Sequence, residues 1–92
     1  MRLTFDPAKS ERSIRTRGWP FDEAANFDFD TALVAVDGRR DYGETRYVAI
    51  GRLNARVHVL CFAETADGIR VISFRKANAR EVNRYDKAQA PD

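Results

Sequence analysis

The sequence predicts an α+β fold in which a mostly antiparallel sheet of four to five strands packs against two N-terminal helices and a C-terminal helix. Apolar segments of strand length follow one another in the second half of the chain, and short turn-like links separate them. Helix-start signals occur near the N-terminus, and apolar residues at helical spacing occur near the C-terminus. Because the links are short, we expect neighbouring strands to pair as an antiparallel meander, with the helices on one side of the sheet.

The N-terminal part of the chain is predicted to form one short strand and two helices. Residues 2–5 fit a strand. Asp6 followed by Pro7 is a typical helix start, because Asp caps a helix and Pro fits its first position. The first helix is therefore expected over residues 7–17, and a second, shorter helix over residues 20–26.

The rest of the chain is predicted to form four strands and a helix. The strands are expected at residues 32–36, 45–50, 56–63 and 69–75. The segment 56–63 is apolar on both faces, as is typical of a central strand. A turn is expected at 51–55 and a hairpin turn at Asp67-Gly68. Apolar side chains recur at helical spacing over residues 78–88, which predicts the last helix.

Size and composition favour one domain spanning residues 1–92. A hydrophobic content of 43% is enough for a single core in a chain of this length. Cys61 and His58 lie in an apolar run, so we expect a buried, unreactive thiol and a packed histidine rather than a general base. Neither a signal peptide nor an apolar run of transmembrane length is visible, which predicts a cytoplasmic protein without a membrane partner.

Metal and cofactor sites are not expected. One His and one Cys without clustered carboxylates cannot make a closed zinc site. The glycines of residues 38–43 lack the strand–loop–helix setting and the Lys-Ser/Thr ending of a phosphate-binding loop. The sequence therefore excludes the common cofactor motifs.

Charge is segregated along the chain, although the net charge is only +2. Residues 1–18 carry a net charge of +3, residues 19–38 carry −5 and residues 39–92 carry +4. This pattern favours a polyanion on one face and a cationic partner on another. Docking of a basic partner segment on the acidic block and pairing of that block with the protein's own basic helix both remain open. The acidic side chains are Asp22, Glu23, Asp28, Asp30 and Asp37.

The stretch 69–85 is the most informative, because it combines a strand with a following helix and five cations. The cations are Arg70, Arg75, Lys76, Arg80 and Arg84, with Glu81 as the one acid among them. Guanidinium groups suit bidentate contacts to phosphate. Strand alternation predicts Arg75 and Ser73 on one face and Arg70 on the other. Arg75 and Lys76, at the end of the strand, are therefore better candidates for the catalytic site than Arg70.

Such a cation set suits RNA cleavage without a metal ion. The reaction needs an in-line 2′-hydroxyl, stabilisation of negative charge on the phosphate and two proton transfers. The candidates for charge stabilisation are Arg46, Arg70, Arg75, Lys76 and Arg80, and those for proton transfer are Glu44, Tyr47 and Tyr85. Ordinary surface ion pairing is the competing interpretation of the cations. A core position is the competing interpretation of Tyr85, because it lies at helical spacing from Val82.

Several motifs together resemble a known toxin family. They are DPAK at 6–9, Arg-x-Arg-Gly at 15–18, FDEAANF at 21–27, GETRYVAIG at 43–51 and IRVISFRKANAREVNRY at 69–85. In this order and spacing, the chain resembles BrnT, the toxin of the BrnT/BrnA type II toxin–antitoxin systems. The family's polar motif positions fall on Glu44, Arg46, Arg70, Ser73, Arg75, Glu81 and Tyr85.

The resemblance implies a RelE-like fold and a metal-independent endoribonuclease that cleaves mRNA and inhibits translation. It also implies neutralisation by a BrnA-type ribbon-helix-helix antitoxin, with operator DNA bound only through that antitoxin. The predicted catalytic residues are Arg75, Lys76, Arg46, Glu44, Tyr47 and Tyr85, and the predicted RNA-binding residues are Arg70, Arg80, Arg39 and Arg40. The alternative is a non-catalytic nucleic-acid-binding or protein-interaction module, which would bind RNA or DNA with steep salt dependence and release no cleavage products.

Overall fold

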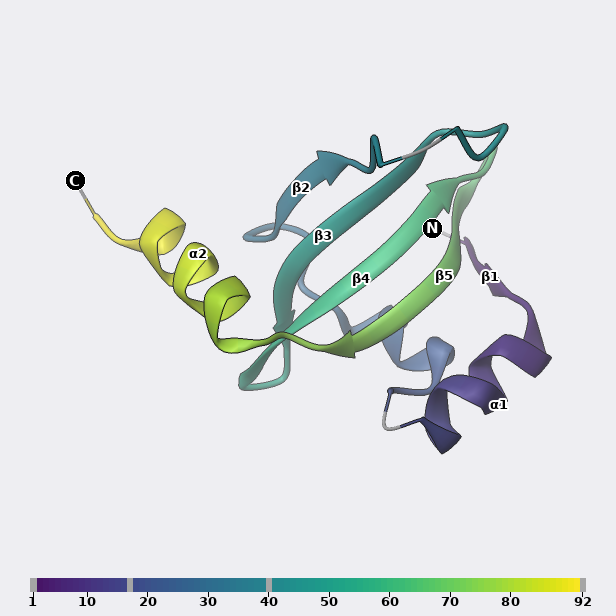
Figure 1. Ribbon diagram of the computed structural model, residues 1–92, viewed down its shortest axis with the longest axis horizontal. Coiled ribbons are helices and arrows are strands. Elements are labelled where there is room, and N and C mark those ends of the chain that lie inside the picture. Colours follow the sequence, from purple (N-terminus) through teal and green to yellow (C-terminus); the bar gives the residue numbers. More distant parts are fainter. Residues whose placement is uncertain (1, 17, 40, 92) are drawn as a thin grey trace.

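The computed structural model describes residues 2–16, 18–39 and 41–91 and confirms the α+β class (Figure 1). The elements in chain order are β1 (Arg2–Phe5), α1 (Pro7–Arg15), the 3-10 helix η1 (Phe21–Asn26), β2 (Leu33–Val36), β3 (Arg46–Leu53), β4 (Arg56–Glu64), β5 (Gly68–Lys76) and α2 (Ala79–Gln89). No helix in this part of the chain is long and apolar enough to cross a membrane.

The five strands form one sheet in the order β1-β5-β4-β3-β2. The sheet is mixed: three pairings are antiparallel, as predicted, but β1 pairs in parallel with β5. This parallel pair joins the two ends of the chain, so the short-range patterns that predict hairpins do not reveal it. The second N-terminal helix is a 3-10 helix rather than an α-helix.

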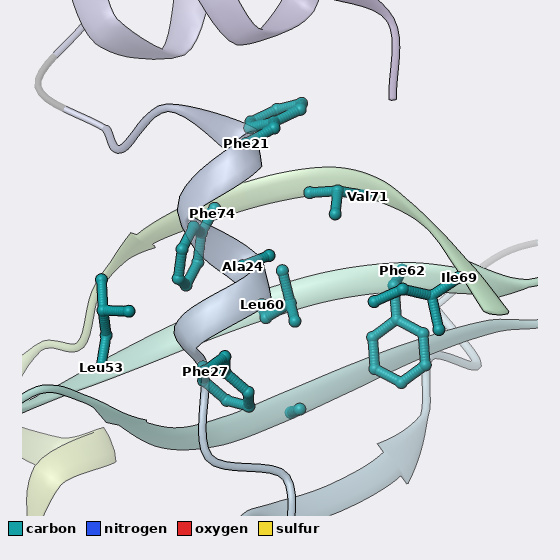
Figure 2. Packing of buried hydrophobic residues seen from close by; sticks show 10 residues of the cluster. Phe21, Ala24, Phe27, Leu53, Leu60, Phe62, Ile69, Val71 and Phe74 are labelled. Carbon is teal, nitrogen blue, oxygen red and sulfur yellow. The ribbon is translucent and has the colours of Figure 1, made fainter. Parts of the chain in front are cut away.

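The two faces of the sheet carry separate apolar clusters. Phe21 and Ala24 of η1, and Phe27 directly after it, pack on the face that contains Leu60 and Phe74, as Figure 2 shows. His58 is also buried on this face, with its ring tilted against that of Phe74 and ring centroids 5.6 Å apart, which confirms that it is a packed histidine.

The opposite face packs against α2. Tyr85 and Val82 contact Ile50, Val57 and Val59 there. The expectation that all helices lie on one side of the sheet is therefore wrong. The physical reason is that β4 carries apolar side chains on both faces, so each face of the sheet has to be packed against another element to keep them from water.

The turn between β3 and β4 is shorter than predicted. β3 continues to Leu53, so only Asn54 and Ala55 form the turn rather than residues 51–55. Asn54 has a φ of 56°, which Asn tolerates better than most residues. Gly51 therefore lies inside a strand, where a Cβ would be 2.7 Å from the Phe27 ring. A glycine is needed at position 51 because the Phe27 ring approaches the strand closely, and not because the chain turns there.

A β-bulge interrupts the regular alternation of β5. Val71 is paired with Phe62 and Ser73 with Cys61, so two steps along β5 match one step along β4. Ile72 is the extra residue, and it is partly exposed. Residues beyond a bulge point to the opposite face from the one that simple alternation predicts.

The bulge places Arg70, Ser73 and Arg75 on one face of the sheet, the face that α2 contacts. Arg70 is opposite Ala63 and Arg75 is opposite Val59, and these two partners share a face of β4. The prediction that Arg70 points away from Arg75 is therefore wrong. Its error came from assuming an uninterrupted strand.

Candidate nucleic-acid interface

Arg46 and Arg70 form a cationic pair at one end of the α2 face. Both are opposite Ala63, Arg46 from β3 and Arg70 from β5. The Glu44 carboxylate accepts hydrogen bonds from both guanidinium groups. The bond from Arg70, and then that from Arg46, holds the pKa of Glu44 below its ordinary value. The Arg46 guanidinium also lies over the Tyr42 ring, 4.2 Å from its centroid.

Arg75 lies farther along the same face, and α2 fixes its orientation. Its two terminal nitrogens donate to the two oxygens of Glu81 at 2.8 and 2.9 Å. Glu81 also accepts a hydrogen bond from the backbone of Asn78, whose side chain caps the helix in return. The Arg75 side chain is nevertheless 49% exposed, against 16% for Glu81. The guanidinium is thus held by the protein and open to a ligand.

A groove of about 470 Å³ extends from Arg75 between α2 on one side and β2 with the segment that follows it on the other. Its apolar floor includes Val48, Ile50, Val59 and Cys61, and its charged residues are Asp37, Arg39, Arg75, Glu81 and Arg84. Guanidinium groups beside an apolar floor suit a nucleotide, which presents both a phosphate and apolar ring surface. Cys61 is partly exposed here, so the prediction of a buried thiol is wrong.

Arg39 reaches the groove from the segment after β2. Its side chain is 76% exposed and donates to both oxygens of Asp37, each at 2.8 Å. These bonds hold the pKa of Asp37 well below its usual range. Arg40, its predicted companion, lies outside the described residues.

Two predicted proton carriers lie away from these cations. Tyr47 is on the opposite face, stacked on Phe62 with ring centroids 5.4 Å apart. Hydrogen bonding to Glu64 raises the pKa of Tyr47. Tyr85 is 1% exposed, and its hydroxyl is 2.9 Å from that of Thr31, which matches the core interpretation. Of the three predicted proton carriers, Glu44 is the one beside the arginines.

Two predicted cations also lie apart from the groove. Lys76 follows Arg75 directly in β5 and is opposite His58, so it points to the other face. Arg80 lines a different hollow on α2, together with Arg84. Adjacent residues of a strand point to opposite faces, so Lys76 does not reach the groove of the α2 face with Arg75, although both side chains line a hollow at the β5 edge.

The structure also adds three residues that were absent from the predicted site. Glu81 orients Arg75, Arg84 lines the groove and Tyr42 lies under Arg46. The spacing of Asn78 and Glu81 is that of a capping box, a signal that could have located Glu81 at the start of α2. We find no comparable signal for Tyr42. Among the described residues, no group of three or more His, Cys, Asp or Glu side chains could hold a metal ion.

Comparison with known proteins identifies the family of the chain. The family model described as "Ribonuclease toxin, BrnT, of type II toxin-antitoxin system" matches residues 5–81. The chain belongs to the BrnT family. The matched region contains the cationic face, including Glu44, Arg46, Arg70 and Arg75. Neither a search of curated proteins nor a search of solved structures found a match. Membership in this toxin family implies an antitoxin partner and RNA as the class of substrate.

The Arg75–Glu81 pair of this BrnT-family toxin predicts an acid-dependent loss of stability. Arg75 lowers the pKa of Glu81 to about 2 from the ordinary 4.5. A depressed carboxyl pKa stabilises the fold fully above the ordinary value, and this stabilisation is lost as the pH falls toward the folded value. The Glu81→Gln variant should therefore unfold more easily than the wild type at pH 7, and the gap should shrink between about pH 5 and pH 2.

Urea denaturation followed by circular dichroism measures this gap. Asp86→Asn, which removes an exposed acid from the same helix, is the matched control and should stay close to the wild type. A gap for Glu81→Gln that is independent of pH would contradict the role of the ion pair.

Proposed function

We propose that this protein is a metal-independent endoribonuclease that cleaves mRNA on the α2 face and thereby inhibits translation. The observation that carries the proposal is the fixed and half-exposed Arg75, which shares its face with Arg46 and Arg70 and lines an apolar groove. A preorganised guanidinium stabilises charge that develops on a phosphate without reorganising during the reaction. Membership in a family of ribonuclease toxins supports the same conclusion.

In this proposal the RNA itself supplies the nucleophile. The 2′-hydroxyl attacks the adjacent phosphorus, its proton passes to a base, and the 5′-oxygen leaves with a proton. The products are a 2′,3′-cyclic phosphate and a 5′-hydroxyl end. Arg75 stabilises the phosphate charge, and water is the proposed proton acceptor. Glu44 accepts hydrogen bonds from Arg46 and Arg70 and orients them, but it lies too far from Arg75 to take the 2′-hydroxyl proton.

The remaining cations bind the substrate. Arg46 and Arg70 are both opposite Ala63 of β4, whereas Arg75 is opposite Val59. These two positions are four residues apart, which corresponds to about 13 Å along a strand. This spacing suits contacts to phosphates that flank the one that reacts. Arg39 would contact RNA at the groove, and Arg80 and Lys76 would contact it outside the groove. Tyr47 and Tyr85 serve the fold in this assignment.

Membership in the family supports a proposal about the partner and the setting. We propose that residues 1–92 act as one RelE-like toxin domain in the cytoplasm. A BrnA-type ribbon-helix-helix antitoxin would neutralise it, and operator DNA would be bound through that antitoxin. The antitoxin part of this proposal rests on the match to a type II toxin–antitoxin family.

A second candidate function is RNA binding without cleavage. The position of Tyr47 and Tyr85 away from the arginines favours it, because the face then holds fewer groups that can move protons. It predicts strongly salt-dependent binding and intact RNA. Product analysis separates the two functions.

Induced expression in a bacterial host tests the proposal. Expression should arrest growth and stop protein synthesis, and coexpression of the antitoxin should restore both. Arg75→Ala should relieve the arrest at equal protein level. Arg56→Ala, which changes an exposed arginine on the opposite face, should remain toxic. Harmless expression of the folded wild-type protein would rule out the toxin function.

A further inference from the structure

A second hollow lies on the other side of the β5 edge, between α1 and β5. β1 pairs with Gly68–Val71, so among the described residues the second half of β5 has no neighbouring strand on this side, and α1 packs there instead (Figure 1). The hollow is a cleft of about 590 Å³, and we call it the α1–β5 cleft. The bulged Ile72 lines it and contributes apolar surface.

The charge of the α1–β5 cleft is of one sign. Its charged lining residues are Lys9, Arg12, Arg75 and Lys76, and all four are exposed. Lys9 and Arg12 are three residues apart in α1, so they lie on the same side of that helix. Unlike Arg39 and Arg75 of the groove, neither Lys9 nor Arg12 forms an ion pair among the described residues. A cleft lined by cations alone attracts a polyanion.

Arg75 connects the two hollows. Its side chain lines both the groove of the α2 face and the α1–β5 cleft, on either side of the β5 edge. A ligand that extends along the groove as far as Arg75 therefore also reaches the α1–β5 cleft. An extended single strand can occupy both hollows at once, whereas a compact ligand occupies one.

We propose that the α1–β5 cleft binds the RNA strand on one side of the phosphate that reacts at Arg75, with Lys9 and Arg12 contacting the flanking phosphates. This inference rests on the proposed function for the place of reaction. Contacts to flanking nucleotides that are equal in the ground state and the transition state lower KM without changing kcat. The cleft is therefore a substrate-positioning site and supplies no catalytic group.

Binding of an uncleavable RNA tests the cleft without requiring catalysis. The probe is a fluorescent single-stranded 2′-O-methyl RNA long enough to span both hollows, and its affinity is measured by anisotropy over a range of salt. Each phosphate contact to a single strand contributes about 0.7 to the slope of log K against log salt. The Lys9→Gln/Arg12→Gln variant should therefore lower that slope by about 1.4. Glutamine retains helix propensity, and circular dichroism checks folding.

The matched control is Arg2→Gln/Arg15→Gln, which removes the same charge at positions outside the cleft. It should change the slope much less. Equal losses in the two double variants would overturn the inference, since they would reflect net charge alone. Unchanged RNA affinity with weakened antitoxin binding would also overturn it, because the cleft would then serve a protein partner.

A cleavage assay separates this inference from the proposed function. On long RNA, Lys9→Gln/Arg12→Gln should raise KM and leave kcat unchanged, while a short RNA confined to the groove should be unaffected. A fall in kcat on both substrates would contradict a positioning role. If the wild type cleaves no RNA, the proposed function fails, and the anisotropy result alone still decides the cleft.

Discussion

Replacing Arg75 by alanine should lower kcat for RNA cleavage on the order of 10²–10³-fold while the protein stays folded. The expected effect is large because Glu81 preorganises this guanidinium, so its loss removes charge stabilisation that costs no rearrangement during the reaction. Folding should survive because the Arg75 side chain is half exposed and Glu81 keeps its capping bond to Asn78. Single-turnover cleavage of a labelled RNA measures the rate, and circular dichroism checks the fold.

Arg75→Lys is the sharper companion variant. Lysine restores the positive charge but cannot form the two parallel bonds to Glu81. Its kcat should therefore fall between those of the wild type and Arg75→Ala. An exposed arginine on the opposite face, Arg56, gives the control for charge loss. An Arg75→Ala variant that cleaves at the wild-type rate would remove Arg75 from the catalytic machinery.

Replacing Phe74 by alanine should destabilise the fold by about 3–5 kcal/mol. Phe74 is 1% exposed, and its ring contacts that of Phe27, with centroids 6.0 Å apart (Figure 2). It also contacts the His58 ring, with centroids 5.6 Å apart. A truncation here leaves a cavity in the main apolar cluster, and small domains have a free energy of unfolding of only about 5–15 kcal/mol. We expect much of the variant to be unfolded at growth temperature.

Urea denaturation measures this loss, and Phe74→Leu is the conservative control that retains most of the buried volume. Phe74 lies between Ser73 and Arg75 in β5, so Phe74→Ala should lose activity together with the fold. Arg75→Ala should lose activity while the protein stays folded, with only the smaller loss of stability that follows from removing its ion pair with Glu81. If Phe74→Ala unfolded at the same urea concentration as the wild type, the packing between η1 and β5 would be wrong.

Local signals predicted much of the fold. The Asp6-Pro7 start of α1 is confirmed by the hydrogen bond from the Ala8 backbone to Asp6, and the apolar run 56–63 lies within the central strand β4. The parallel pairing of β1 with β5 was not predictable in this way, because it depends on contacts between distant segments. The position of α2 on the opposite face follows from the two-sided burial of β4, which the sequence did reveal.

The site was predicted in part for a similar reason. Arg46, Arg70 and Arg75 were recognised by residue type, and the structure places them on one face. The bulge at Ile72 places Arg70 on the same face as Arg75, although regular alternation predicts opposite faces. No glycine or turn residue in this part of the sequence indicates a bulge. Lys76 could have been separated from Arg75 at once, because neighbouring strand residues alternate. The position of Glu44 between two arginines needed the register of three strands.

Cleavage of RNA by the purified protein in the presence of a metal chelator tests the central claim most directly. We expect products with 2′,3′-cyclic phosphate and 5′-hydroxyl ends, and no cleavage where a 2′-deoxynucleotide replaces the attacking ribose. The Arg75→Ala protein should leave the same RNA nearly intact. RNA that stays intact with the folded wild-type protein, or cleavage that requires an added divalent metal, would contradict the account.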